Sequence, residues 1–233
     1  MKLSILICAY NEKDSILPIL ERVQNADLGT DWEKEIILVD NFSTDGTREM
    51  IQEIAQGDDP AIKVILQPRN LGKGTSIRTG YAQATGKYAV IQDADFEYDP
   101  ADLKLLLEKA ESSEADAVFG SRTLDGQVTY KYVQNYWGNM FVTRIINCLF
   151  GGHLTDAATA TKLVRTGIIE DLNLKGTHFD LDFELPCKLL KKGYRVDEVP
   201  VSYQPRTAAE GKKIRPWDGL HALWVILKYR FLD

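Results

Sequence analysis

The chain has 233 residues, of which 44% are hydrophobic and 27% are charged, values typical of a soluble globular protein. This length corresponds to one large domain or two small ones, and the composition excludes disordered, collagen-like and coiled-coil proteins. The net charge of −6 hides an asymmetry, because residues 1–120 carry −10 and residues 121–233 carry +4. An acidic half suits metal ions, whereas a basic half suits phosphates or an anionic surface.

The first half alternates short apolar runs with amphipathic stretches. Strands are predicted at 3–8, 35–40, 62–66, 88–92 and 117–120. Helices are predicted at 14–23, 47–55 and 72–84, and a fourth begins at Asp99-Pro100. Continuous apolar runs indicate strands covered on both faces, and strand–helix alternation indicates parallel pairing. We therefore expect a doubly wound α/β sheet over 1–120, with ligands beyond the carboxyl ends of its strands.

The second half has a different pattern and no linker separates it from the first. Helices are predicted at 132–150, 182–192 and 217–231, and strands at 162–164 and 196–203. Because no repeat and no Gly/Ser/Pro-rich segment interrupts the chain, we interpret residues 1–233 as one domain.

Asp93 and Asp95 directly follow the predicted strand at 88–92. Alternate residues of an extended chain share a face, so the two carboxylates repel each other unless a cation or protons compensate. Carboxylate and phosphate oxygens are preferred ligands of Mg²⁺ and Mn²⁺. The alternative is that Asp93 and Asp95 only end a strand and cap the following helix, but Asp99 already provides that cap. We therefore expect a divalent metal at Asp93 and Asp95, with Glu97 extending the acidic cluster.

Polar residues also follow two other predicted strands at the same edge of the sheet. Asp40 ends the second strand, and the turn Ala9-Tyr10-Asn11-Glu12 follows the first. A carboxylate at this edge is able to accept hydrogen bonds from a base N–H or a ribose hydroxyl. Three strand ends are therefore expected to converge on one crevice.

The segment RTAAEGKKI at 206–214 places Arg206, Lys212 and Lys213 around a glycine. Such a basic loop is able to close over a diphosphate, and a solvated run of charges is the alternative.

Other nucleotide-binding motifs do not match. GKGTS at 72–76 lacks the residues that a P-loop or a dinucleotide fingerprint requires. A nucleotidyltransferase is expected to carry a glycine-rich N-terminal loop, and CAYNEKDS has no glycine. A non-catalytic sugar-nucleotide-binding protein has no need of Asp93, Asp95 and a cationic loop together. The combination favours an enzyme.

Taken in order, CAYNE, VDNFSTDGT, NLGKGTSIRTGY and QDADFEYDP resemble the family 2 glycosyltransferases of GT-A fold. GSR, GNMFVTRIIN, LTDAATATKLVR and GYRVDEVPVSYQPRTAAEGKKI resemble the branch of dolichyl-phosphate mannose synthases and polyprenyl-phosphate glycosyltransferases. The resemblance covers nearly the whole chain. It implies a mainly parallel sheet with helices on both faces, a nucleotide-sugar-binding part at 1–120 and an acceptor-binding part at 121–233.

The resemblance also implies roles for the residues at the donor site. The D-x-D motif, completed by a third side chain, holds Mg²⁺ or Mn²⁺ against a nucleoside diphosphate; its members are Asp93, Asp95 and Glu97. The side chains that hold the base, the ribose and the phosphates are Ala9, Tyr10, Asn11, Glu12, Asp40, Lys73, Arg206 and Lys212 or Lys213.

The implied reaction is inverting transfer of a hexose from a GDP- or UDP-linked sugar to a polyprenyl phosphate, with Arg122 binding the lipid phosphate and no nucleic-acid partner. The sequence departs from the branch at two positions. Residues 130–139 contain only Lys131 as a cation where the mannose synthases have a further arginine, and Ala160 occupies a small-residue site. A carbohydrate hydroxyl therefore remains open as the acceptor, in glycan or cell-surface polysaccharide synthesis. A phosphate is already ionised, whereas a hydroxyl requires a base. Asp156 is the candidate base, and a turn cap is its structural alternative.

The predicted helix at 217–231 is amphipathic, which suits either core packing or contact with a bilayer beside a polyprenyl acceptor. The longest apolar run, 222–227, is too short to span a membrane. The scattered Cys8, Cys148 and Cys187 indicate a reducing compartment. We therefore expect a cytoplasmic protein able to contact the inner face of the membrane peripherally.

Overall fold

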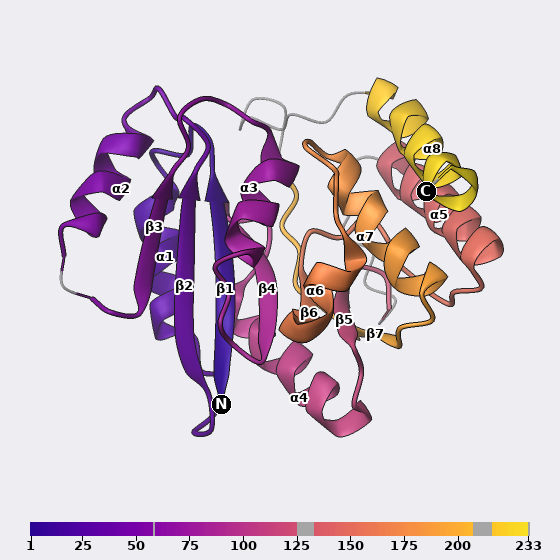
Figure 1. Cartoon of the computed structure of the whole chain (residues 1–233), viewed down its shortest axis with the longest axis horizontal. Helices are drawn as coiled ribbons and strands as arrows, with labels where there is room; N and C mark the ends of the chain where they lie inside the picture. Colours follow the sequence, from indigo (N-terminus) through magenta and orange to yellow (C-terminus); the bar gives the residue numbers. More distant parts are fainter. Residues whose placement is uncertain (58, 125–132, 207–215, 233) are drawn as a thin grey trace.

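The computed structural model describes residues 1–57, 59–124, 133–206 and 216–232 and places them in one seven-stranded sheet with helices on both faces (Figure 1). The strands are β1 (Lys2–Ala9), β2 (Glu33–Asp40), β3 (Ile62–Leu66), β4 (Tyr88–Asp93), β5 (Ala117–Ser121), β6 (Lys162–Arg165) and β7 (Val196–Pro200). The helices are α1 (Ile16–Asn25), α2 (Thr47–Ala55), α3 (Lys73–Tyr81), η1 (Pro100–Asp102), α4 (Leu103–Ser113), α5 (Val133–Phe150), α6 (Thr166–Leu172), α7 (Asp180–Lys191) and α8 (Pro216–Phe231).

The strand order is β3-β2-β1-β4-β6-β5-β7. Strands β1 to β4 pair in parallel, as do β5 and β7, and these pairings confirm the α/β class and the mainly parallel sheet. The expectation of one parallel set over residues 1–120 is corrected, because β6 lies between β4 and β5 and is antiparallel to both. The first residue of β6, Lys162, therefore lies at the edge where the parallel strands end.

Most elements predicted from hydrophobic periodicity are present with small shifts of their ends. The helix start at Asp99 is confirmed, because its carboxylate accepts a hydrogen bond from the Ala101 N–H at 3.0 Å and Pro100 is the first helical residue. The short helix α6 was not predicted, and β7 ends at Pro200 rather than at residue 203.

The apolar side chains of the sheet divide between two cores. Helices α1, α2 and α4 cover one face, helices α3, α6 and α7 cover the other, and helices α5 and α8 pack against α7. Helices α5 and α8 pack side by side at the end of the molecule farthest from β3 (Figure 1). In the parts of the chain that the structure describes, no helix is both long and apolar enough to cross a membrane.

Helix α4 offers a direct test of this packing, because two adjacent leucines differ in burial. Leu106 is fully buried, whereas Leu105 is 42% exposed. We expect Leu106→Ala to lower the free energy of unfolding by about 2–5 kcal/mol, since it removes buried methyl groups and leaves a cavity. Leu105→Ala is expected to change it by less than about 0.5 kcal/mol. Denaturant unfolding measures both, and equal losses would contradict the assigned face of α4.

Candidate active site

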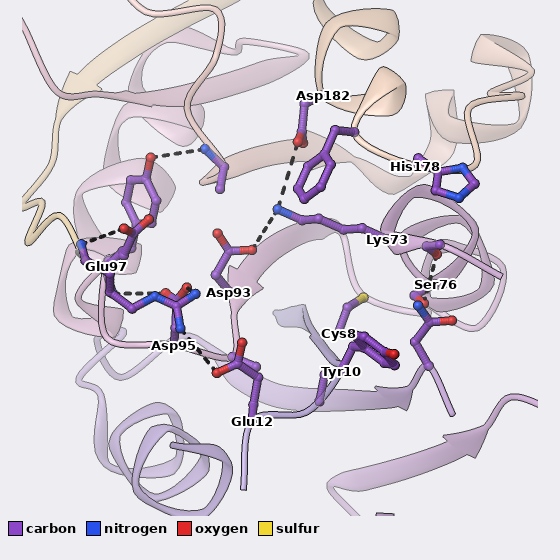
Figure 2. Close-up of a pocket in the computed structure, with 18 of the residues that line it drawn as sticks. Cys8, Tyr10, Glu12, Lys73, Ser76, Asp93, Asp95, Glu97, His178 and Asp182 are labelled. Atoms are coloured by element: carbon purple, nitrogen blue, oxygen red, sulfur yellow. Dashed lines mark hydrogen bonds and ion pairs between the residues drawn. The ribbon is translucent and has the colours of Figure 1, made fainter. Parts of the chain in front are cut away.

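A cavity of about 350 Å³ opens at the carboxyl ends of β1 and β4 (Figure 2). Its walls come from the turn after β1, the start of α3, the segment after β4, the start of α7 and the segment that follows β7. The side chains used below that line it are Tyr10, Glu12, Asn41, Lys73, Asp93, Asp95, Glu97, Arg122, Asp182, Tyr203 and Arg206. Of the polar residues predicted to converge at this edge, Asp93, Asp95 and most of the turn after β1 line the cavity, whereas Asp40 does not.

Asp93 and Asp95 lie together in the cavity, and each is paired with a basic side chain. The Asp93 Oδ1 atom is 2.9 Å from the Lys73 Nζ atom, and the Asp95 carboxylate accepts a hydrogen bond from the Arg206 guanidinium. Burial and the negative charge of Asp93 raise the pKa of Asp95 to about 7, although Arg206 acts in the opposite direction. The carboxylate pair therefore requires more positive charge than these side chains supply.

The donor atoms at this position fit a divalent metal of the Mg²⁺ or Mn²⁺ type. Such ions commonly bind to one or two carboxylates together with substrate phosphates, and Asp93 and Asp95 offer two hard oxygen ligands on one wall of the cavity. These two carboxylates have no third protein ligand beside them, since across the described residues no three His, Cys, Asp or Glu side chains are grouped in a way that could hold a metal. The remaining ligands would have to come from the substrate. In this conformation Glu97 is engaged elsewhere, since it accepts hydrogen bonds from the Arg206 N–H at 2.8 Å and the Tyr203 hydroxyl at 3.3 Å.

Lys73 is held between two acidic residues from different elements (Figure 2). Its Nζ atom is 3.9 Å from the Asp182 Oδ2 atom, in addition to its contact with Asp93. Burial lowers the pKa of Lys73, but the negative charges of Asp182, Asp93 and Asp95 together raise it above its ordinary value. Lys73 is therefore a permanent positive charge in the cavity.

The two glycines beside Lys73 allow this placement. Gly72 has a φ of +89°, and a Cβ atom there would lie 2.2 Å from the Thr177 carbonyl oxygen. A Cβ atom on Gly74 would lie 2.7 Å from the His178 carbonyl oxygen. The GKG sequence thus lets the start of α3 pack directly on the backbone before α7, which brings Lys73 to Asp182. The sequence analysis missed Asp182, whose only signal was its position in the first turn of a predicted helix.

The turn after β1 lies in the cavity wall as expected, although Asn11 lies to one side. Ala9, Tyr10 and Glu12 line the main cavity, and the Glu12 carboxylate is 3.4 Å from the Arg206 Nη1 atom. Asn11 lines a neighbouring hollow, and its Oδ1 atom accepts a hydrogen bond from the Thr44 N–H at 2.9 Å. Lys212 and Lys213 lie outside the residues that the structure describes.

Asp40 does not line the cavity. Its carboxylate is fully buried, accepts hydrogen bonds from the Phe42 and Ser43 N–H groups at 3.1 Å, and pairs with the Arg48 guanidinium. In this conformation Asp40 orders the loop after β2, and Asn41, which the sequence analysis did not single out, lines the cavity instead.

At the other side of the cavity, Arg122 and Asp156 form a buried bidentate pair. The Arg122 Nε and Nη2 atoms lie 2.6 and 2.8 Å from the Asp156 carboxylate, and the Arg122 N–H and the Asn139 side chain donate to it as well. The Arg122 guanidinium also lies 5.1 Å from the centre of the Tyr203 ring. Asp156 is thus surrounded by donors, whereas Arg122 borders the cavity.

This environment does not suit the role of general base that was expected for Asp156 if the acceptor is a hydroxyl. The side chain is fully buried and does not line the cavity. Burial raises the pKa of Asp156, but Arg122 and the hydrogen bonds outweigh it and lower the pKa below its ordinary value. A buried carboxylate with a lowered pKa accepts a proton poorly. The geometry instead supports a role in holding Arg122.

Comparison with known proteins places this site in context. The family model described as Glycosyl transferase family 2 matches residues 4–172. The dodecaprenyl-phosphate galacturonate synthase of Rhizobium johnstonii is 29% identical over 178 residues, which cover 76% of this chain and 51% of that protein. The undecaprenyl-phosphate 4-deoxy-4-formamido-L-arabinose transferase of Proteus mirabilis is 30% identical over 173 residues, which cover 72% of this chain and 50% of that protein. The chain therefore spans about half the length of these two relatives.

A solved structure shares the fold. The glucosyl-3-phosphoglycerate synthase of Mycobacterium tuberculosis, in complex with Mn²⁺, UDP and phosphoglyceric acid, matches 100% of this chain and 79% of its own, with a TM-score of 0.70. Its sequence identity is 16%, so the likeness concerns the architecture alone.

The raised pKa of Asp95 predicts a specific pH dependence of stability. An aspartate in an unfolded chain titrates near 3.8 and Asp95 in the fold near 7, so the folded protein binds the extra proton between these values. This contribution to stability is complete below pH 4 and is lost as the pH rises through 7. We therefore expect the metal-free wild type to lose stability relative to Asp95→Asn as the pH is raised from 5 to 8. Denaturant unfolding in the presence of a chelator measures the difference, and parallel pH profiles would contradict the assignment.

Proposed function

The chain belongs to glycosyl transferase family 2, and on that premise we propose that it transfers a hexose, with inversion, from a nucleoside-diphosphate sugar to a polyprenyl phosphate in a metal-dependent reaction. One observation carries the proposal: a single cavity has the Asp93–Asp95 pair with Lys73 and Arg206 on one side and Arg122 on the other. The family model and the polyprenyl-phosphate acceptors in the names of two relatives support it.

Asp93 and Asp95 would hold Mg²⁺ or Mn²⁺, which when bound neutralises charge on the leaving diphosphate. Lys73 and Arg206, which pair with these carboxylates in the free protein, would then bind phosphate oxygens of the donor. Glu97 holds the segment that carries Arg206, through the hydrogen bond from the Arg206 N–H. The turn Ala9–Glu12 would bind the nucleoside part.

On the acceptor side, we propose that Arg122 binds the lipid phosphate. Asp156 fixes the guanidinium with two hydrogen bonds, and the Tyr203 ring covers it. A monoester phosphate is already ionised at neutral pH and attacks the anomeric carbon without giving up a proton to the protein. The absence of a base at Asp156 is therefore compatible with a phosphate acceptor.

A carbohydrate hydroxyl is the second candidate acceptor, and one observation favours it. Asp182 lines the cavity, and among the described residues its buried Oδ1 atom has no hydrogen-bond partner, so this carboxylate is the candidate base for an acceptor hydroxyl. Incubation with labelled UDP- and GDP-sugars and either undecaprenyl phosphate or soluble glycans decides between the two. Label extracted into organic solvent supports the lipid phosphate, and label that remains with the glycans supports the hydroxyl.

The substitution Asp95→Asn tests the donor site. It removes one negative ligand, so we expect transfer to fall by about 100-fold or more and Mn²⁺ binding with UDP to be lost in titrations followed by electron paramagnetic resonance. Asp99→Asn, the same change four residues away at an exposed helix cap, is the matched control, because Asn also caps helices. Full transfer by Asp95→Asn would contradict the metal assignment.

We also propose that helices α5 and α8 present one surface to an anionic bilayer. Val133, Trp137 and Phe141 of α5 are 58–70% exposed at intervals of four residues, so they share a face. On α8, Trp224, Leu227 and Phe231 are 44–69% exposed. Arg144, Lys228 and Arg230 accompany these two stripes, and α5 contains no acidic residue. Aromatic and basic side chains together suit an interface with anionic headgroups.

The position of α5 connects this surface to the proposed acceptor site. While Trp137 and Phe141 face outward, Asn139 of the same helix is buried and donates a hydrogen bond to Asp156 at 2.8 Å. A bilayer in contact with the outer face of α5 would therefore be separated by this helix from the Arg122–Asp156 pair, where the lipid phosphate is proposed to bind.

Flotation with vesicles of phosphatidylcholine and phosphatidylglycerol tests the surface. We expect Trp137→Glu and Trp224→Glu each to reduce the floated fraction several-fold, because a carboxylate opposes both apolar burial and anionic lipid. Leu105→Glu, on α4, is the control and should float like the wild type. If all three variants float equally well, this surface does not contact the bilayer; circular dichroism verifies that each variant is folded.

A further inference from the structure

Lys162 is a buried lysine close to the cavity. The reaction proposed above gives this side chain no role. Lys162 is the first residue of β6, and its side chain is fully buried. Lysine is almost never fully buried without a partner, because its ammonium group loses hydration. Since β6 runs antiparallel to β4 and β5, Lys162 lies at the edge of the sheet where the cavity is formed.

The contacts of Lys162 connect it to the loop that carries Asp156. Its ammonium group donates a hydrogen bond to the Thr159 carbonyl oxygen and lies 5.4 Å from the centre of the Phe119 ring. The loop from residue 156 to 161 begins at Asp156, which holds Arg122, and two of its residues, Ala158 and Ala160, line the cavity. Lys162 thus holds this loop through a hydrogen bond to its backbone.

The charges around Lys162 come from four different parts of the chain. Asp182 at the start of α7 and Asp156 are the acidic groups, and Lys73 at the start of α3 and Arg122 are the basic groups. Burial lowers the pKa of Lys162 to about 8; Lys73 and Arg122 act in the same direction, and Asp182 and Asp156 act against it. At neutral pH the side chain is therefore mostly charged.

The charge balance at Arg122 shows why another cation matters. Asp156 already neutralises the Arg122 guanidinium through the bidentate contact, so this pair adds little net positive charge. A monoester phosphate carries nearly two negative charges above its second pKa of about 6. An anion bound at Arg122 therefore requires a further positive charge nearby.

We propose that Lys162 is a positioning residue of the acceptor site: it holds the loop of residues 156–161 through the Thr159 carbonyl and supplies the buried positive charge that an acceptor phosphate at Arg122 requires. This inference rests on the proposed function, because it takes a phosphate as the acceptor. Lys162 itself does not touch the cavity and acts through the loop and through its charge.

A pH dependence follows from this arrangement. As the pH rises through about 8, Lys162 loses its proton and the acceptor site loses one positive charge. Of the surrounding groups, Lys73 has a raised pKa, Asp156 has a lowered pKa and arginine stays protonated in proteins. The bound phosphate is also fully ionised in this range. Asp95, which lines the same cavity with a pKa of about 7, titrates in every variant. Acceptor binding should therefore weaken above pH 8 more in the wild type than in Lys162→Arg.

The test measures the Kd of farnesyl phosphate, a soluble prenyl phosphate, by isothermal titration calorimetry at pH 7 and pH 9.5. For the wild type we expect Kd to rise about tenfold between the two values, the effect of one lost charge interaction. Lys162→Met should bind about tenfold more weakly than the wild type already at pH 7, and between pH 7 and 9.5 its Kd should change no more than that of Lys162→Arg. Lys162→Arg should keep tight binding at both values.

Lys188→Met is the matched control, since Lys188 is also buried and donates to a backbone carbonyl, that of Asn173, at 2.6 Å, away from the cavity. It should lose stability yet keep the wild-type pH profile. Mn²⁺-dependent binding of UDP verifies that each variant is folded. The proposal is overturned if Lys162→Met binds farnesyl phosphate like the wild type, or if Lys162→Arg weakens at pH 9.5 as the wild type does. A wild type that binds UDP but no farnesyl phosphate would instead overturn the phosphate acceptor, and this inference with it.

Discussion

Asp93 and Asp95 place two negative charges side by side in a partly buried cavity, and their repulsion is the constraint that organises the surrounding residues. Lys73 reaches Asp93 from the start of α3, and Arg206 reaches Asp95 from the segment after β7. Each cation requires its own supporting structure: close backbone packing at two glycines for Lys73, and hydrogen bonds to Glu97 and Glu12 for Arg206. The positive charges that a diphosphate requires are therefore already gathered where the two carboxylates require them.

Contacts through Glu97 and Tyr203 connect the side of the cavity that holds Arg206 with the side that holds Arg122. Glu97 accepts hydrogen bonds from both the Arg206 N–H and the Tyr203 hydroxyl, and the Tyr203 ring covers the Arg122 guanidinium. The Tyr203 ring also packs 5.2 Å from that of Tyr98, which follows the acidic pair in sequence. Glu97 and Tyr203 therefore form a continuous set of contacts between Arg206 and Arg122. Acidic residues of the first half of the sequence, such as Asp93 and Asp95, and basic residues of the second half, Arg122 and Arg206, line this one cavity.

The parts of the fold that could be predicted are those with a local signal. The strands that precede Asp40 and Asp93 are continuous apolar runs, and the cap at Asp99 is a pattern of two adjacent residues. Strand β6 has four residues, too few to show whether it pairs in parallel or which strands it joins. For that reason the separation of β4 from β5, and the place of Lys162 at the cavity edge, could not be predicted.

The sequence by itself determined the family, the α/β class and the acidic pair at a strand end, because each depends on residues that are close together along the chain. Only the tertiary structure decided what each polar side chain contacts. It showed that Asp156 is closed in by Arg122, that Asp40 orders its own loop, and that Asp182, more than a hundred residues from Lys73, pairs with it. Burial and hydrogen-bond partners depend on which distant segments pack together, so they set the charge and availability of these groups independently of the motif in which each residue occurs.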